Sequence, residues 1–141
     1  MNRKYINPES LLNWSSMFTQ VVVTEGNGLN FIYISGQVGV DSSKKLVGNG
    51  SLQDQTHQAL VNLQIALNSV GATTKDVVKL LIYVRNYHYE QAAVIREELQ
   101  RAFVINQLPA VSLIGVFALA EEHFLIEIDA HAIAETESGD I

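Results

Sequence analysis

The segment from Val77 to Val84 places the strongest constraint on how this chain folds. Seven of its eight residues are apolar or aromatic, and Lys79 is its one charged residue. A short run of this kind, rich in β-branched residues, is typical of a strand that is buried on both faces. Because a wide apolar sheet face is not left in water, both sides of the sheet that holds this strand need a cover.

The other predicted elements are too few to supply both covers. In chain order they are strands at 19–24 and 31–35, a helix at 52–70, the strand at 77–84, a helix at 90–103, and strands at 110–116 and 124–134. The pattern indicates an α+β fold with a mixed sheet, and two helices cover only one face of such a sheet. Self-association is the simplest cover for the second face.

Composition narrows the class of protein. The length of 141 residues fits a single domain spanning 1–141, and there is no cysteine. The N-terminus has no signal-peptide pattern, and no apolar run reaches the roughly 18 residues that cross a bilayer, so we expect a cytoplasmic protein with no membrane partner. The net charge of -6 and the scattered basic residues argue against nucleic-acid binding. We expect Glu135–Ile141 to be a flexible tail.

The last predicted strand carries the clearest candidate chemistry. Glu127, Asp129 and His131 alternate with apolar residues and therefore share one face of the strand. Two carboxylates and an imidazole suit acid–base catalysis or metal binding. The same alternation is also what any half-exposed strand shows. No second cluster of ligating residues supports a metal site, and no cofactor-binding motif is present, so we predict neither a metal nor a cofactor.

A second candidate lies at the end of the strand predicted at 31–35. Ser35 and Gly36 stand there, and a glycine at a strand end lets a ligand or another backbone approach closely. The alternative is that Gly36 only turns the chain.

Several segments together resemble the YjgF/Rid family, also called the reactive intermediate deaminase or L-PSP endoribonuclease family. The matching segments are Ile32–Gln37, Gln58–Leu63, Val77–Lys79, Leu108–Ala110 and Leu125–Ala130. The likeness extends over about residues 18–133, the expected core of the domain. It implies a chorismate-mutase-like fold and a homotrimer that binds a small molecule in a cleft at each subunit interface. The archetypal members hydrolyse 2-imino acids to 2-keto acids and ammonia without a metal or cofactor.

The resemblance also implies a set of site residues. Glu127 corresponds to the glutamate that positions water and is the catalytic candidate, while Ser35 and Gly36 match the ligand-binding turn. Three positions depart from the family pattern: Phe18 replaces a tyrosine, Val94 an asparagine, and Val111 the arginine that clamps the substrate carboxylate. Ser112, next to that position, completes the ligand-binding candidates. These replacements make the cleft more apolar than in the archetype.

Four functions therefore remain open. The chain is a hydrolase or deaminase acting on a less charged substrate, a non-catalytic ligand-binding or regulatory protein, the archetypal 2-imino acid deaminase, or a ribonuclease. The acidic composition disfavours the ribonuclease.

Overall fold

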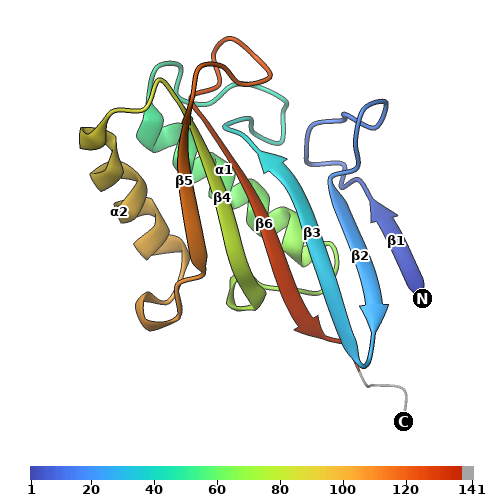
Figure 1. The fold of residues 1–141 in the computed structure, drawn as a ribbon. Helices are drawn as coiled ribbons and strands as arrows, with labels where there is room; N and C mark the ends of the chain where they lie inside the picture. The colour runs from blue at the N-terminus through green and yellow to red at the C-terminus, as the bar shows by residue number, and fades with distance from the viewer. Residues whose placement is uncertain (138–141) are drawn as a thin grey trace.

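The doubly apolar segment forms β4 (Val77–Arg85), which lies between two neighbours in a six-stranded sheet (Figure 1). The computed structural model describes residues 1–137. The strand order is β1-β2-β3-β6-β4-β5, in which β4 and β5 are parallel and the other neighbours antiparallel. The remaining strands are β1 (Asn2–Ile6), β2 (Val21–Gly26), β3 (Leu29–Gln37), β5 (Ala110–Val116) and β6 (Ile126–Glu135). The predicted mixed sheet is confirmed.

The hairpin of β2 and β3 leads directly to the candidate site. Asn27 and Gly28 form its loop with φ angles of 54° and 75°, the left-handed conformation that suits a two-residue hairpin turn. β3 then pairs with β6, and the register shifts between Ile34 and Gln37. Gly36 therefore stands in a β-bulge, where a strand bends and its side chains are re-aimed.

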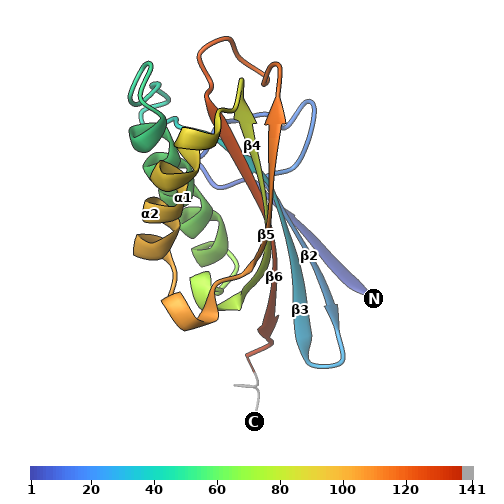
Figure 2. The same cartoon turned by 60° about the vertical axis from the view of Figure 1, so that its left-hand side comes forward.

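Both helices pack on the same face of the sheet, as Figure 2 shows. They are α1 (Leu52–Asn68) and α2 (Ala92–Ala102). The predicted start of the first helix is confirmed, because the hydroxyl of Ser51 accepts a hydrogen bond from the Asp54 amide at 3.2 Å. The core between helices and sheet is built from fully buried aliphatic side chains, among them Leu63, Leu67, Leu80, Ile82, Ile95, Ile126 and Ile128.

The opposite face of the sheet is uncovered in the single chain. Leu80 and Ile82 of β4 are buried beneath the helices, whereas the alternate residues point to the other side and are only half-buried. Large apolar side chains exposed on this open face include Tyr33, Ile114 and Ile133. The prediction that two helices cover one face only is confirmed. Among residues 1–137, no helix is long and apolar enough to cross a membrane.

The N-terminal strand β1 is absent from the sequence prediction, which expected about five strands. Four of its five residues are exposed, so it lacks the apolar alternation that identifies a strand. β1 is instead held by backbone pairing to β2 and by side-chain hydrogen bonds, from Asn2 to Glu25 at 2.9 Å and from Arg3 to Thr24 at 3.2 Å.

Several element ends also differ from the prediction by one or two residues. The second helix begins at Ala92, after a short 3-10 turn over Tyr89–Gln91, and β6 begins at Ile126. Of the expected tail, Glu135 is the last residue of β6, and the Thr136 amide donates to the Gly28 carbonyl at 2.9 Å. Residues 138–141 lie outside the described residues.

We predict that the open face is covered by further copies of the chain in a trimer. Light scattering at micromolar concentration is expected to give the mass of three chains for the wild type. Ile133→Glu places a charge on the open face and is expected to lower that mass. Ile105→Glu, in a 3-10 turn outside the sheet, is the control and should leave it unchanged. A monomeric wild type would contradict the prediction.

Candidate functional site

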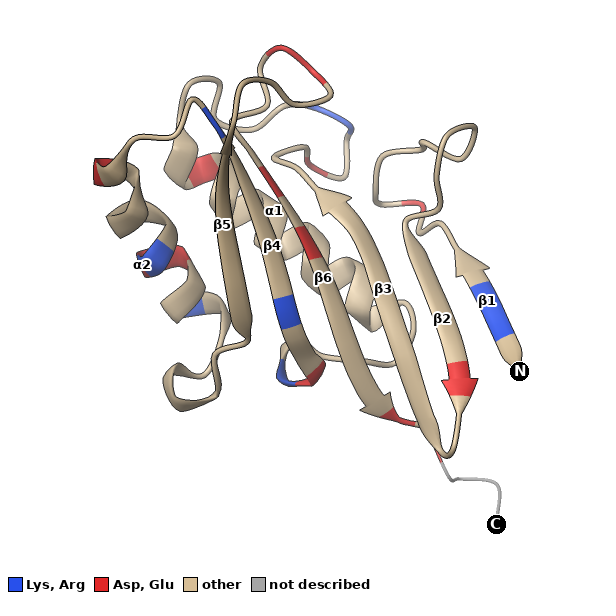
Figure 3. Cartoon of the chain, viewed as in Figure 1, with Lys and Arg blue, Asp and Glu red and all other residues tan. Residues whose placement is uncertain are grey.

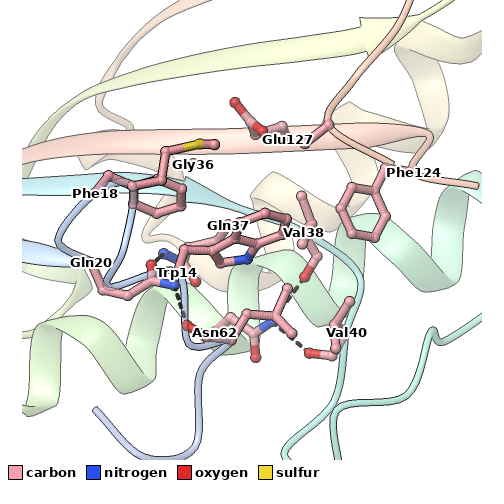
Figure 4. A pocket seen from close by; sticks show the side chains of 13 residues that line it. Trp14, Phe18, Gln20, Gly36, Gln37, Val38, Val40, Asn62, Phe124 and Glu127 are labelled. Atoms are coloured by element: carbon pink, nitrogen blue, oxygen red, sulfur yellow. Dashed lines mark hydrogen bonds between the residues drawn. The ribbon is translucent and has the colours of Figure 1, made fainter. Parts of the chain in front are cut away.

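A pocket of about 70 Å³ opens where β3 ends and β6 begins. Figure 4 shows the aromatic side chains of Trp14, Phe18 and Phe124 around it, with Glu127 at its edge. The lining is mostly apolar, with four polar side chains. The full set is Leu12, Trp14, Met17, Phe18, Gln20, Gly36, Gln37, Val38, Val40, Asn62, Ala120, Phe124 and Glu127.

One wall of the pocket is the irregular segment that precedes β2. The rings of Trp14 and Phe18 stack with centroids 5.9 Å apart and an interplanar angle of 15°. Two buried glutamine side chains fix this segment to β3. Gln20 donates to the carbonyl of Leu12 at 2.8 Å and accepts from the side chain of Gln37, also at 2.8 Å.

The other walls are fixed by buried side-chain amides of α1. The Asn62 amide donates to the carbonyls of Val38 and Val40, each at 2.8 Å, and so holds the loop that follows β3. Gln55 donates to the His123 carbonyl at 3.0 Å and accepts from the Leu125 amide at 2.9 Å. These two bonds flank Phe124 in the chain and hold it at the pocket.

Glu127 owes its position to Gly36. The Glu127 side chain lies directly over the glycine, so that a β-carbon at position 36 would overlap its Cγ and Cδ atoms. The glycine leaves room for a close approach, but the group that approaches in the single chain is the Glu127 side chain and not the ligand or backbone expected from the sequence. The carboxyl oxygens of Glu127 accept no hydrogen bond from any residue in the described range 1–137.

The electrostatic environment favours the protonated form of Glu127. Burial, and secondarily the negative charge of Asp129, raise its pKa above the ordinary value. Burial also raises the pKa of Asp129, while His131 opposes that shift. Figure 3 shows acidic residues in the first half of β6, and none of the residues that line the pocket is Lys, Arg or His. Among residues 1–137, no group of three or more His, Cys, Asp and Glu side chains is arranged to hold a metal ion.

The structure brings together three of the residues proposed from the sequence. Phe18, Gly36 and Glu127 line the pocket. Ser35 stands beside it, but its hydroxyl donates to the Thr19 carbonyl at 2.6 Å and so holds the same irregular segment.

The other three proposed residues lie elsewhere in the same chain. Val94 is on α2, and Val111 is on β5, paired with Leu80. Ser112 points to the open face, where its hydroxyl accepts from Lys79 at 2.9 Å. A cleft that unites these residues with Glu127 at a subunit interface stays a prediction.

The sequence prediction does not include most of the pocket walls. Trp14, Gln37, Asn62 and Phe124 are not among the residues it proposes. The spacing of four between Trp14 and Phe18 is a weak signal by itself. The position of Gln37 directly after the candidate residue Gly36 is a stronger signal that Gln37 lies at the site.

Comparison with known proteins identifies the family. The family model described as Endoribonuclease L-PSP matches residues 12–134. The chain belongs to the YjgF/Rid family. A protein from Homo sapiens named 2-iminobutanoate/2-iminopropanoate deaminase is 30% identical over 102 residues, which cover 72% of each chain. A relative of the same name from Dermatophagoides farinae is 29% identical over 106 residues, covering 75% of this chain and 80% of the relative.

Solved structures give the same fold. A protein of the conserved Rid family from Yersinia pestis superposes with a TM-score of 0.72 and is 38% identical, covering 95% of this chain and all of the other. A member of the YjgF/YER057c/UK114 family from Mycobacterium tuberculosis has a TM-score of 0.74 and 27% identity, covering 94% of this chain and 100% of the other. The predicted fold class is confirmed.

We predict that Gly36→Ala displaces the Glu127 carboxyl from its place over the bulge. The displaced group gains solvent, so its pKa should fall toward the ordinary value. The atoms that move belong to the end of a flexible side chain, so the loss of stability should be small. Carbon-detected NMR titration of the Glu127 carboxyl measures this change. Gly26→Ala is the matched control, since an added β-carbon there meets no atom within 4 Å. An unchanged titration in Gly36→Ala would count against the assigned contact.

Proposed function

We propose that this chain is a cofactor-free hydrolase that acts on the C=N bond of a small compound without a carboxylate. The observation that carries the proposal is Glu127, a carboxyl with a raised pKa at the edge of an apolar pocket. Membership of the YjgF/Rid family, with relatives named as imine deaminases, supports the reaction class.

Glu127 would serve as the acid–base group. Its carboxylate accepts a proton from a water molecule as the water oxygen attacks the carbon of the C=N bond. Protonated Glu127 passes this proton to the nitrogen, which gives a carbinolamine. Glu127 then moves the proton of the carbinolamine hydroxyl to the nitrogen as the C–N bond breaks, and the products are a carbonyl compound and ammonia. A raised pKa suits both steps, because such a carboxyl exchanges its proton more readily near neutral pH than an ordinary glutamate does.

The substrate differs from that of the archetype because nothing in the pocket pairs with a carboxylate. Val111 stands where the family resemblance expects the clamping arginine, and no pocket-lining residue is a cation. A buried anion without a partner is strongly disfavoured. Each charge-assisted hydrogen bond that is lost costs about 1.5–3 kcal/mol, so 2-imino acids should bind poorly.

A second candidate is a ligand-binding trimer without turnover. Apart from Glu127 and the side-chain oxygen of Gln37, the pocket's polar side chains are engaged in holding its walls: Asn62 bonds two carbonyls, and Gln20 bonds Leu12 and Gln37. This leaves few groups for chemistry and favours binding. In either case the proposed partners are further copies of the chain and a small molecule, without nucleic acid.

We expect the wild type to hydrolyse the imine formed by oxidation of isobutylamine about 10-fold faster, or more, than 2-iminopropanoate. Only 2-iminopropanoate brings a carboxylate that the pocket leaves unpaired. Both imines are generated in situ by oxidases, and ammonia release is measured against the uncatalysed rate. Glu127→Gln should lower the faster rate by about 100-fold or more. Glu121→Gln, an exposed loop residue, is the control. Equal rates for the wild type and Glu127→Gln would favour the second candidate function, a ligand-binding trimer without turnover.

The pH dependence gives an independent check. As a base, Glu127 acts in its ionised form, so kcat/KM should fall with decreasing pH around a midpoint above the ordinary pKa of glutamate. Asp129→Asn removes the neighbouring negative charge, which favours ionised Glu127 and moves the midpoint to lower pH. The midpoint should stay above the ordinary value because burial is the larger cause. A midpoint that rises in Asp129→Asn would contradict the assignment.

A further inference from the structure

We infer that the pocket selects an apolar ligand carrying an N–H donor, an amine or a protonated C=N group, and excludes a carboxylate with the same hydrocarbon group. The inference rests on the site of the proposed function and names the ligand chemistry that this site takes. Such selection depends on the binding groups alone and requires no turnover.

The first support is an acceptor that no residue of the described chain uses. Gln37 is only 3% exposed, and its side-chain nitrogen donates to the Gln20 side chain at 2.8 Å and to the Ser35 carbonyl at 2.9 Å. A backbone carbonyl only accepts, so the nitrogen of Gln37 must face Ser35, and the other end of the amide is an oxygen. Within residues 1–137 this oxygen accepts no hydrogen bond, although Gln37 lines the pocket.

The second support is the charge at the pocket edge. Glu127 adds two carboxyl oxygens that are likewise free among the described residues. Asn62 contributes no donor, because its amide hydrogens bond the carbonyls of Val38 and Val40. The indole N–H of Trp14 is a neutral donor and does not balance a full charge. A carboxylate would therefore lie near Glu127 without a cation, whereas an ammonium or iminium group finds two kinds of acceptor.

The third support is the size and polarity of the pocket. About 10–15 Å³ of pocket space is enough to admit one water molecule, so a volume of about 70 Å³ admits a group of a few heavy atoms. Trp14, Phe18 and Phe124 make the surroundings apolar. The ligand that fits has a short branched hydrocarbon end in the pocket and its nitrogen at the Glu127 edge.

Three probes with the same isobutyl group test this selection: isobutylamine, isobutanol and isovalerate. Trp14 is the one tryptophan of the sequence and lines the pocket, so its fluorescence reports binding, with calorimetry as a second readout. We expect isobutylamine to bind with a millimolar Kd at neutral pH, isobutanol more weakly, and isovalerate at least 10-fold more weakly than the amine. Glu127→Gln should weaken the amine about 10-fold and leave isobutanol unchanged, while Glu121→Gln changes neither.

Two outcomes would overturn the inference: isovalerate binding as tightly as the amine, or equal amine affinity in wild type and Glu127→Gln. If Glu127→Gln does not fold, Phe18→Lys in its place supplies a cation at the pocket and should reverse the preference toward isovalerate. Failure here is distinct from failure of the proposed function. Selective amine binding without imine hydrolysis would support this inference and contradict the proposed hydrolase function. Imine hydrolysis without amine selectivity would support the hydrolase function and contradict this inference.

Discussion

The pocket depends on buried carboxamide side chains that hydrogen-bond the backbone of irregular segments. Asn62 holds the loop after β3, Gln55 holds the segment before β6, and Gln20 with Gln37 holds the aromatic wall. Buried carbonyl and amide groups outside regular structure need such partners, because each unsatisfied group costs about 1–3 kcal/mol. Carboxamides do not titrate, so the walls keep their geometry while the carboxyl at the edge gains or loses a proton.

The alternation of β6 couples the core to the chemistry of the site. Ile126, Ile128 and Ala130 are fully buried beneath the helices, which forces Glu127 and Asp129 onto the open face. One oxygen of Asp129 is buried there without a hydrogen-bond partner among the described residues. The open face therefore carries both the apolar surface that calls for further copies of the chain and the Asp129 charge that adds to the effect of burial in raising the pKa of Glu127.

How far the sequence predicts this molecule depends on the range of the interactions involved. Local patterns predict both ends of β5 and the N-terminal cap of α1 at Ser51, because strand composition and helix capping are properties of neighbouring residues. The sequence pattern does not predict β1, because this strand is held by backbone pairing and not by the burial of apolar side chains. Glu127 and Gly36 are proposed from the sequence, and their close contact is not, because it arises from a bulge in β3. The side-chain amide hydrogen bonds that build the pocket likewise join distant segments, so no periodic pattern in the sequence predicts them.

The packing of Glu127 over Gly36 has a consequence for how this protein can change over time. Two positions far apart in the chain share one volume, so a larger residue at position 36 either displaces the Glu127 side chain, as expected for Gly36→Ala, or requires a shorter side chain at position 127. Substitutions at the two positions would not combine independently in a library of variants. A lineage that replaced the glycine first would displace the acid from its place, so the effect of a change at one position depends on the residue at the other.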